Sequence, residues 1–314
     1  MPLAIEVRRL TKTYPGGVEA VKEIDFVVEA GEVFGLLGPN GAGKSTTIGM
    51  LSTTILPTSG SARLAGHDVV REPLEARRLS SVVFQDAVVD RALTGRHNLA
   101  IHANLWGVPR ASAERRVGQL ASPFGLDQIL DRTVSSYSGG QRRRLEIVRA
   151  LLSEPRVLFL DEPTVGLDPR IRFELLDLIG GLRARGDMTI FLTTHYLDEA
   201  ERLCDRVAIV HEGRIVAMDA PKALLAALGR EIVELRVIGD PVGALTALRS
   251  HGIANGDAFT VGSSLTIPLR DGSAHEAVAA IAALGITTQA VSTRVPTLDD
   301  VYLRLTGTRL AHAA

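Results

Sequence analysis

The distribution of apolar and polar positions predicts strands that alternate with helices over the first part of the chain. Apolar runs at Val33–Leu37, Val157–Leu160 and Met188–Thr194 are typical of parallel strands that are buried on both faces. By contrast, Leu3–Arg9 alternates apolar and polar residues, as a half-exposed strand does. A further short strand is expected at Ser81–Gln85, ending on the glutamine. This alternation of strands and helices indicates an α/β fold.

Helical patterning dominates from about residue 92 to 152, with breaks near Pro109, Pro123 and Tyr137. A pair of strands that resembles a hairpin, at 207–211 and 214–217, ends this part of the chain. We therefore expect a first domain over residues 1–222, with a helical subdomain at about 92–152.

The pattern changes after Pro221 and Gly229. Strands are then expected at 231–238, 258–261, 264–269 and 286–293. Helices are expected at 241–251, 272–284 and 297–305. The order β-α-β-β-α-β is that of a ferredoxin-like domain. We expect a separate small α+β domain over residues 228–314.

Composition narrows the range of functions. The chain has 314 residues with 46% hydrophobic residues, and 35 Lys+Arg against 36 Asp+Glu give a formal net charge of −1. This balance argues against a nucleic-acid partner, which would require a basic excess or stripe. No stretch reaches the roughly 18 apolar residues of a membrane span. If the protein serves a membrane, another chain must cross it.

Two local features are expected to be structural. The basic run Arg142-Arg143-Arg144 lies in a predicted helix, where consecutive side chains point about 100° apart, so we expect a mostly solvated face and no tight patch. The single cysteine, Cys204, excludes an internal disulfide, and in a helix-like segment it is expected to act as a small buried hydrophobe.

Residues 38–46 read Gly-Pro-Asn-Gly-Ala-Gly-Lys-Ser-Thr and match the phosphate-binding loop. The loop follows the apolar strand at 33–37 and precedes a predicted helix at 46–51, so a phosphate would lie at a helix N-terminus. Lys44 would reach the terminal phosphates, and the Ser45 hydroxyl would contact Mg²⁺. An ordinary glycine-rich turn with an exposed lysine is the alternative. A dinucleotide-binding loop fits poorly, because Thr46 occupies its third glycine position.

Four further stretches place polar side chains at the ends of predicted strands or at a helix start. Asp161-Glu162 follows the strand at 157–160, where Asp161 is placed to hold Mg²⁺ and Glu162 to orient or deprotonate an attacking water. Ser138 is a good N-cap for a helix that is expected over Gln141 to Leu152. The two glycines between Ser138 and Gln141 are able to receive phosphate oxygens. An acidic turn and an ordinary capped helix are the respective alternatives. His195 and Gln85 also end strands, and each would mean little alone.

In this order, the motifs resemble those of the nucleotide-binding subunit of an ABC transporter. Gly38 to Thr46 resembles the Walker A motif, Gln85 the Q-loop, Tyr137 to Gln141 the signature motif, Val157 to Glu162 Walker B, Gly166 to Pro169 the D-loop, and His195 the switch histidine. The resemblance covers roughly residues 1–220. It implies a P-loop NTPase domain with a mainly parallel core sheet, an antiparallel β subdomain and a helical subdomain.

Additional stretches resemble one branch of this family, the ATP-binding subunits of exporters of the daunorubicin/doxorubicin-resistance type. They are Leu93 to Arg96, Pro163 to Pro169, Thr194 to Glu201 and Pro296 to Tyr302. Two positions depart from the pattern: Tyr137 stands where the signature usually has Leu, and His97 stands where Glu is expected.

The resemblance implies a role for each motif residue. It implies that Tyr14 stacks on adenine and that the phosphates of ATP lie on Gly38, Asn40, Gly41, Gly43, Lys44, Ser45 and Thr46. It implies Mg²⁺ held by Ser45, Gln85 and Asp161, with catalysis by Glu162, His195 and Gln85. From a second copy of the chain, Ser138, Gly139, Gly140 and Gln141 would contact the γ-phosphate, with Asp168 at the dimer seam.

The implied function is an ATPase that binds ATP and Mg²⁺ and powers efflux of a drug, antibiotic or other hydrophobic compound. Its partners would be a second copy and a separate transmembrane permease, at the cytoplasmic face of the cell membrane. Trp106, in the helical stretch, is either a docking residue for that permease or a core residue. Export of lipid or polysaccharide, and a soluble ABC ATPase without a transport role, are the alternatives. An importer subunit of the sugar type fits less well, since its C-terminal domain resembles a longer β-barrel.

Overall fold

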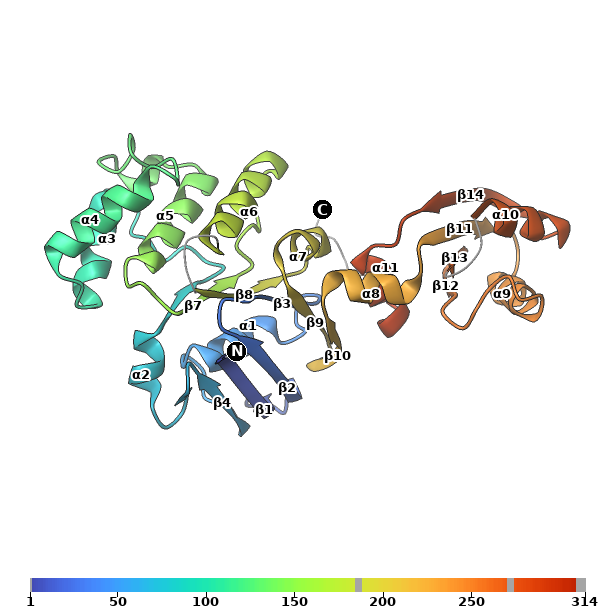
Figure 1. The fold of residues 1–314 in the computed structure, drawn as a ribbon, viewed down its shortest axis with the longest axis horizontal. Helices are drawn as coiled ribbons and strands as arrows, with labels where there is room; N and C mark the ends of the chain where they lie inside the picture. Colours follow the sequence, from blue (N-terminus) through green and yellow to red (C-terminus); the bar gives the residue numbers. More distant parts are fainter. Residues whose placement is uncertain (1, 184–187, 270–273, 309–314) are drawn as a thin grey trace. The chain divides into compact units, whose positions relative to one another are not determined.

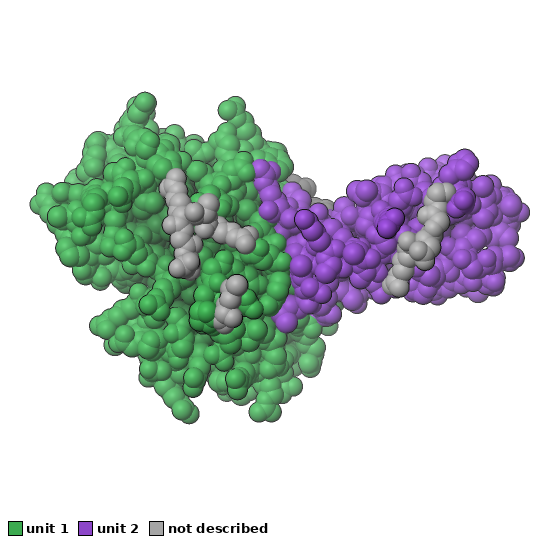
Figure 2. Space-filling view, viewed as in Figure 1, with its two compact units in different colours: residues 1–195, 203–215 green, residues 196–202, 216–314 purple. Residues whose placement is uncertain are grey.

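The computed structural model describes residues 2–183, 188–269 and 274–308. The chain divides into two compact units, Met1–His195 with Leu203–Ile215 and Tyr196–Arg202 with Val216–Ala314 (Figure 2). The two units are described separately.

A six-stranded sheet forms the centre of the first unit, in the order β10-β9-β3-β8-β7-β6 (Figure 1). Its strands are β3 (Val33–Leu37), β6 (Ser80–Val83), β7 (Val157–Asp161), β8 (Thr189–Thr194), β9 (Arg206–His211) and β10 (Arg214–Asp219). The pairs β3–β8, β8–β7, β7–β6 and β3–β9 are parallel. Every residue of β3, β7 and β8 is buried, which confirms the buried parallel strands expected from their apolar runs.

An antiparallel sheet in the order β2-β1-β4-β5 lies beside it, with β1 (Leu3–Thr13), β2 (Glu19–Glu29), β4 (Ser59–Leu64) and β5 (His67–Asp68). Strand β1 extends beyond the predicted end at Arg9, because Leu10 is fully buried and Lys12 continues the pairing with Val21 of β2. Stacked rings join the two sheets: Phe34 of β3 lies 5.5 Å from Phe26 of β2 and 5.6 Å from Phe191 of β8, between centroids. Each such pair contributes about 0.5–1.5 kcal/mol beyond its buried area.

The helices of this unit are α1 (Lys44–Leu51), α2 (Pro73–Arg78), α3 (Gly95–Leu105), α4 (Arg110–Ala121), α5 (Gly139–Leu151) and α6 (Pro169–Arg183), with a 3₁₀ turn at Val134–Ser136. Pro109 separates α3 from α4, as its position in the sequence predicts. Helix α1 begins at Lys44, two residues earlier than predicted. Helices α2 and α6 were not predicted, although Pro169 at the first position of α6 is a helix-start signal.

Two expectations about this unit were wrong. Arg143 is not on a solvated face: it is 7% exposed and pairs with Glu146 at 3.1 Å, because α5 packs against the loop after β6. Strand β6 ends at Val83, so Gln85 lies in the following loop and not at the end of the strand. Cys204 lies just beyond helix α7 (Leu197–Leu203) and packs against the apolar core with its sulfur close to Gly35, as expected of a small hydrophobe, although it is only half-buried.

The second unit contains a four-stranded antiparallel sheet in the order β12-β13-β11-β14. Its elements are α8 (Pro221–Leu228), β11 (Glu231–Val237), α9 (Pro241–Ser250), β12 (Phe259–Val261), β13 (Ser264–Leu269), α10 (Ala274–Ala283), β14 (Thr288–Arg294) and α11 (Leu298–Thr306). The order of elements and the sheet order confirm the ferredoxin-like α+β arrangement. Residues 272 and 273 of the predicted helix at 272–284 lie outside the described residues.

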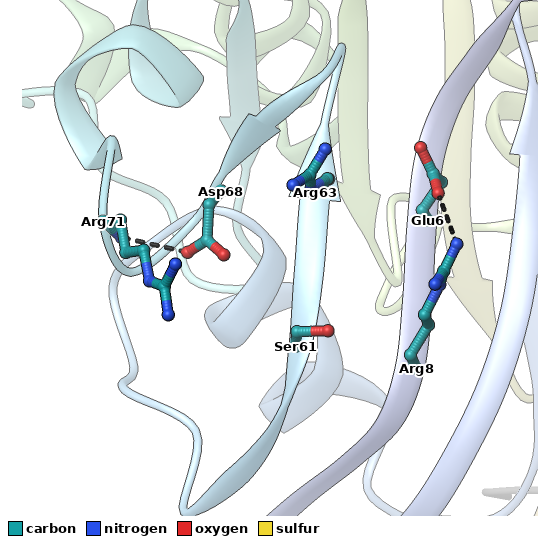
Figure 3. A pocket seen from close by; sticks show the side chains of 6 residues that line it. All are labelled: Glu6, Arg8, Ser61, Arg63, Asp68 and Arg71. Carbon is teal, nitrogen blue, oxygen red and sulfur yellow. Dashed lines mark hydrogen bonds and ion pairs between the residues drawn. The ribbon is translucent and has the colours of Figure 1, made fainter.

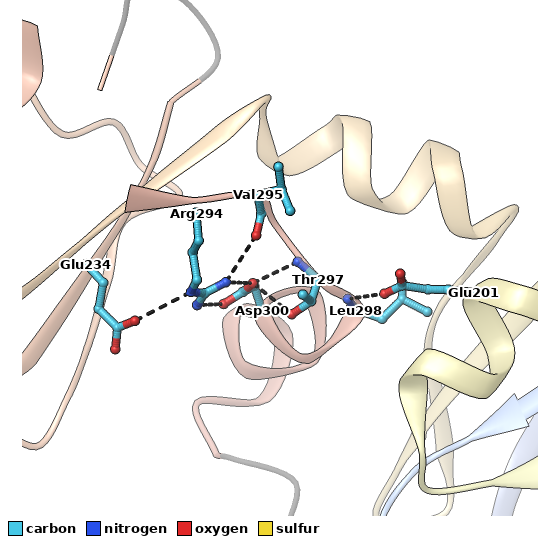
Figure 4. A network of polar contacts seen from close by, with 7 residues as sticks. All are labelled: Glu201, Glu234, Arg294, Val295, Thr297, Leu298 and Asp300. Carbon is cyan, nitrogen blue, oxygen red and sulfur yellow. Dashed lines mark hydrogen bonds and ion pairs between the residues drawn. The ribbon is translucent and has the colours of Figure 1, made fainter. Parts of the chain in front are cut away.

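A polar network fixes the start of α11 in this unit (Figure 4). Asp300 is 3% exposed and accepts two hydrogen bonds from the Arg294 guanidinium, at 2.6 and 2.7 Å. It also accepts the backbone N–H of Thr297, which completes a capping box. Glu201 accepts the backbone N–H of Leu298 at 2.9 Å. Burial alone would raise the pKa of Asp300, but the bonds from Arg294 and Thr297 hold this pKa below its usual value.

Helix α11 should therefore lose stability when Asp300 is neutralised. Asp300→Asn removes charge-assisted hydrogen bonds that contribute about 1–3 kcal/mol. Because the folded-state pKa of Asp300 is depressed, its contribution is complete above the ordinary pKa of 3.8 and is lost as the pH falls below it. Amide hydrogen exchange of α11 in the full chain measures both effects. Asp131→Asn, in an exposed ion pair of the first unit, is the control, and equal protection of α11 in the two variants would contradict the assignment.

Candidate functional site

The predicted motifs meet at one edge of the parallel sheet. Strands β3, β8, β7 and β6 are parallel neighbours, so the loops that follow them leave from the same edge (Figure 1). These loops carry the phosphate-binding motif, His195, Glu162 and Gln85 respectively. In open α/β sheets, ligands bind outside the carboxyl ends of the strands.

The glycines of the loop after β3 are required by geometry. Gly43 has φ +101°, and a Cβ there would lie 2.3 Å from the carbonyl oxygen of Ala20. A Cβ on Gly38 would lie 2.4 Å from the carbonyl oxygen of Val210. The loop can therefore follow this path only with glycine at both positions. It ends at α1, whose first helical residue is Lys44.

Lys44 lies at the centre of a buried polar chain. Its Nζ donates to the carbonyl oxygens of Gly38 at 2.8 Å and Pro39 at 3.0 Å. The same atom lies 3.0 Å from Oε1 of Glu162, and both side chains are at least 95% buried. Nδ1 of His195 lies 3.3 Å from the same Oε1. The structure thus brings Lys44, Glu162 and His195 together around one carboxylate oxygen.

Glu162 is held there by the backbone. Its φ of +46° lies in the left-handed region, which is uncommon for a residue with a side chain. Its N–H donates to the hydroxyl of Thr193 at 3.0 Å and to the carbonyl of that residue at 3.2 Å. Backbone strain of this kind is concentrated at functional sites.

A second group of oxygens lies beside this chain. The Ser45 hydroxyl donates to Oδ1 of Asp161 at 3.1 Å, and the Thr193 hydroxyl donates to the same atom at 2.6 Å. Thr193 was not predicted as a site residue. It pairs directly with Asp161 across β7 and β8, and a hydroxyl near the end of an apolar strand was the available signal. A hydroxyl and a carboxylate are oxygen ligands of the type that Mg²⁺ prefers, so the residues fit this ion.

A hollow of about 410 Å³ opens in front of these groups. Its lining includes most of the nucleotide-binding residues predicted from the sequence, namely Tyr14, Asn40, Gly41, Gly43, Lys44, Ser45, Thr46, Gln85 and Glu162. The Tyr14 hydroxyl lies 3.3 Å from that of Thr46, which ties the aromatic residue to the start of α1. Lys12 places its ammonium 5.2 Å from the centre of the Tyr14 ring.

The structure leaves eight predicted residues out of the lining of this hollow. Gly38, Asp161 and His195 contact the lining residues Lys44, Ser45 and Glu162, respectively. The lining of the hollow contains none of Ser138, Gly139, Gly140, Gln141 and Asp168. The Ser138 hydroxyl accepts the Gln141 N–H at 3.2 Å, and the Gln141 side chain accepts the Ser138 N–H at 2.9 Å, forming a capping box. Asp168 accepts the N–H of Ile171 at 3.1 Å at the start of α6.

Packing explains two residues near the signature motif. A Cβ on Gly140 would lie 2.4 Å from a methyl carbon of Ile171, so this glycine permits the contact between α5 and α6. Tyr137, the residue found where Leu is usual, is 4% exposed and donates to the carbonyl of Ile129 at 2.5 Å. The Tyr137 hydroxyl occupies the position that a side chain at residue 95 would need. Glycine at position 95 therefore leaves room for the Tyr137 ring and its hydroxyl.

A partly apolar groove of about 240 Å³ lies between the loop after β6 and α3. Phe84, Val88 and Trp106 line it, and Trp106 is 46% exposed, which excludes a core position. His102 lies 5.3 Å from the Trp106 ring, between centroids. Burial, with a smaller effect of Arg149, lowers the pKa of His102 to about 4, so this ring is neutral near pH 7. His97 is exposed on the same helix.

A separate hollow of about 370 Å³ lies on the antiparallel sheet (Figure 3). Its lining residues are polar, namely Glu6, Arg8, Ser61, Arg63, Asp68 and Arg71, and none of them belongs to the motifs described above. Across the described residues, no helix combines the length and apolarity that a membrane crossing requires.

Comparison with known proteins agrees with this geometry. Residues 21–165 match the family model described as ABC transporter. The chain is 42% identical to the daunorubicin/doxorubicin resistance ATP-binding protein DrrA of Streptomyces peucetius, over 97% of this chain and 92% of that protein. It is 38% identical to the Nod factor export ATP-binding protein I of Burkholderia lata, over 98% of each.

Among solved structures, the chain resembles cbiO1 from Clostridium perfringens, described as part of the ABC transporter complex cbiONQ. The TM-score is 0.67 at 29% identity, and the match covers 72% of this chain and 92% of cbiO1. This likeness confirms the predicted P-loop NTPase fold. The chain therefore belongs to the ABC transporter family, as an ATP-binding subunit of the daunorubicin/doxorubicin-resistance branch.

Proposed function

We propose that the chain hydrolyses ATP to ADP and phosphate and that this reaction drives export through a separate membrane subunit. The observation that carries the proposal is the buried contact of Lys44, Glu162 and His195 beside the Ser45–Asp161 pair. In this arrangement the Lys44 ammonium, which would bind the phosphates, lies next to the Glu162 carboxylate, which would accept a proton from water. Water then attacks the γ-phosphorus, the bond to the β-phosphate oxygen breaks, and Glu162 takes the proton.

Ser45 and Asp161, with Gln85 from the loop after β6, would hold Mg²⁺. When bound, the ion supplies charge neutralisation at the phosphates. Tyr14 would stack on the adenine, since it lines the same hollow as the phosphate loop. His195 would hold the γ-phosphate by a hydrogen bond.

The ion pair between Lys44 and Glu162 suggests how ATP prepares its own hydrolysis. Lys44 cannot fully contact a phosphate while it is held by the Glu162 carboxylate at 3.0 Å. A bound γ-phosphate would compete for the ammonium group and release the carboxylate toward water. The nucleophile would therefore be activated only when the phosphate is in place.

We propose that a second copy of the chain completes each site. Ser138, Gly139, Gly140, Gln141 and Asp168 do not line the hollow of their own chain. Ser138 and Gly139 lie at the N-terminus of α5, a 13-residue helix whose dipole favours a negative group there. In the dimer, this helix would face the γ-phosphate on Lys44 of the other copy, and Asp168 would lie at the seam.

The permease would dock on the groove lined by Phe84, Val88 and Trp106, and this contact would hold the chain at the cytoplasmic face of the membrane.

The names of the relatives favour a drug, antibiotic or other hydrophobic compound as cargo. Export of a lipid or polysaccharide is the second candidate, since one relative is named as a Nod factor export protein and not as a drug-resistance protein. We further propose that residues 1–222 act as the nucleotide-binding domain and 228–314 as an accessory domain.

Glu162→Gln should abolish most turnover while retaining ATP binding. The amide keeps the shape of the side chain but cannot accept a proton, and general-base assistance contributes about 10²–10⁴ in rate. We expect kcat to fall by that factor and ATP to trap a dimer, measured by light scattering. Glu114→Gln, in an exposed ion pair on α4, is the control. Near-normal turnover of Glu162→Gln would contradict the assignment.

Lys44→Ala should weaken nucleotide binding itself. A charge-assisted hydrogen bond contributes about 1.5–3 kcal/mol, so ATP affinity should fall by roughly 10- to 150-fold. Because this change also leaves the Glu162 carboxylate without its cation, the double variant K44A/E162Q tests binding without a buried lone charge. Titration with a fluorescent ATP analogue measures the nucleotide affinity of both variants, and Lys222→Ala on α8 is the control. Unchanged affinity in both would refute the phosphate-loop assignment.

Tyr14→Ala should reduce ATP affinity through the loss of stacking. Stacking of a base on an aromatic side chain is worth about 1–3 kcal/mol, which corresponds to about 5- to 150-fold. Tyr14→Phe keeps the ring, loses only the hydroxyl near Thr46, and should bind ATP nearly as well as the wild type. If both variants lose affinity equally, Tyr14 contributes through its hydroxyl and not through stacking.

A further inference from the structure

The loop that carries Gln85 is held by two buried charged residues of α5. Arg143 donates to the carbonyl oxygen of Phe84 at 2.6 Å and to that of Gln85 itself at 2.8 Å. Glu146 accepts the N–H of Val88 at 2.7 Å. Both ends of the segment Phe84–Val88 are therefore bonded to one turn of the same helix.

The two side chains also bind each other. Nη1 of Arg143 lies 3.1 Å from Oε2 of Glu146, and the side chains are 8% and 3% exposed. Burial shifts each pKa toward the neutral form, lowering that of Arg143 and raising that of Glu146, while the attraction between the two charges opposes both shifts. A buried ion pair seldom stabilises a fold more than apolar side chains of similar volume would. Its hydrogen bonds to the loop are what apolar side chains could not provide.

The geometry of an arginine suits this task. Its planar guanidinium presents several donors in a fixed fork, so it can bond two successive carbonyls and a carboxylate at once. Lysine carries a single charged nitrogen and cannot reproduce that arrangement. The backbone orientation of Gln85 is consequently set by the side chain of Arg143.

The clamped segment has different surroundings on its two sides. Gln85 lines the hollow that holds Lys44 and Glu162, whereas Phe84 and Val88 line the groove beside Trp106. Helix α5, which carries the clamp, begins at Ser138 and Gly139. The Arg143–Glu146 pair thus joins three parts of the first unit: the nucleotide hollow, the groove and the signature helix.

We propose that Arg143 and Glu146 are positioning residues, which fix the Phe84–Val88 loop to α5 so that Gln85 meets the nucleotide in its working orientation. The proposal rests on the ATPase function proposed above and adds two residues to it. Neither residue lines the nucleotide hollow, so their effect would pass through Gln85. They also make the groove at Phe84 and Val88 responsive to the position of α5.

The test compares four variants of the full chain. Arg143→Gln removes the fork, and Arg143→Lys keeps the charge without it. The double variant R143Q/E146Q removes both charges, so no lone buried charge remains to unfold the protein. Arg116→Gln is the matched control, since Arg116 on α4 likewise donates to a carbonyl, that of Leu152, and to a carboxylate, that of Glu154, away from the loop.

Two readouts separate positioning from a general structural role. In steady-state ATPase assays at varied Mg²⁺, we expect kcat to fall about 10- to 100-fold in Arg143→Gln and in the double variant, because misplacing a group by about 1 Å can cost 10²-fold. The KM for ATP should stay within about threefold, since Lys44 and Tyr14 are unchanged. The kcat of Arg143→Lys should lie between the kcat of these two variants and that of the wild type. Arg116→Gln should have the kcat of the wild type.

Amide hydrogen exchange provides a readout without catalysis. Without nucleotide, exchange of residues 84–89 should rise at least tenfold in Arg143→Gln and the double variant, while exchange of residues 38–46 stays unchanged. If the double variant keeps wild-type kcat and wild-type exchange, the proposal is overturned. If the wild type has no ATPase activity, the proposed function fails, and the exchange result still decides whether the pair holds the loop.

Discussion

The contact between the Lys44 ammonium and the Glu162 carboxylate is the interaction on which the site depends. It joins the loop after β3 to the loop after β7, strands that are separated in the sheet only by β8. The parallel register creates this proximity, since Thr193 of β8 pairs with Asp161 and holds the N–H of Glu162. Glycine at positions 38 and 43 then lets the phosphate loop approach closely enough for Lys44 to reach the carboxylate. A buried pair of opposite charges is costly to separate, so a ligand that separates them must bring comparable charge.

The second organising element is α5. Its N-terminus carries the signature residues, its buried face holds the loop of Gln85 through Arg143 and Glu146, and its packing on α6 requires Gly140. A single helix thus connects a surface proposed to meet another copy with the loop that lies between the hollow of Lys44 and the groove of Trp106. The rigidity of an α-helix makes it suited to connect them, because a displacement at one end is carried to the other.

Much of the fold could be predicted because the local signals agree with one another. The apolar runs of β3, β7 and β8 could be recognised, since strands buried on both faces exclude polar residues. The second unit was predictable from turn residues and periodicity, and its sheet order follows from the β-α-β-β-α-β order. The prediction was wrong for Arg143 because a charged residue in a helix is usually solvated, and the two carbonyl groups that it bonds lie in a loop about 60 positions away. Helix α6 was missed although Pro169 marks its start.

By itself the sequence determined the chemistry: the order of a phosphate loop, a glutamine, a capped helix start, paired acidic residues and a histidine was sufficient to indicate the family. The motifs can be recognised in the sequence because each one requires particular residue types within a short stretch, such as glycine at positions where no Cβ can fit. Only the tertiary structure decided which of these residues share one hollow and which face elsewhere. It placed Ser138 and Asp168 outside the hollow of Lys44, and it buried one arginine of the basic run, Arg143, in an ion pair with Glu146. These are properties of packing between distant segments, and the local pattern of a single segment carries no information about them.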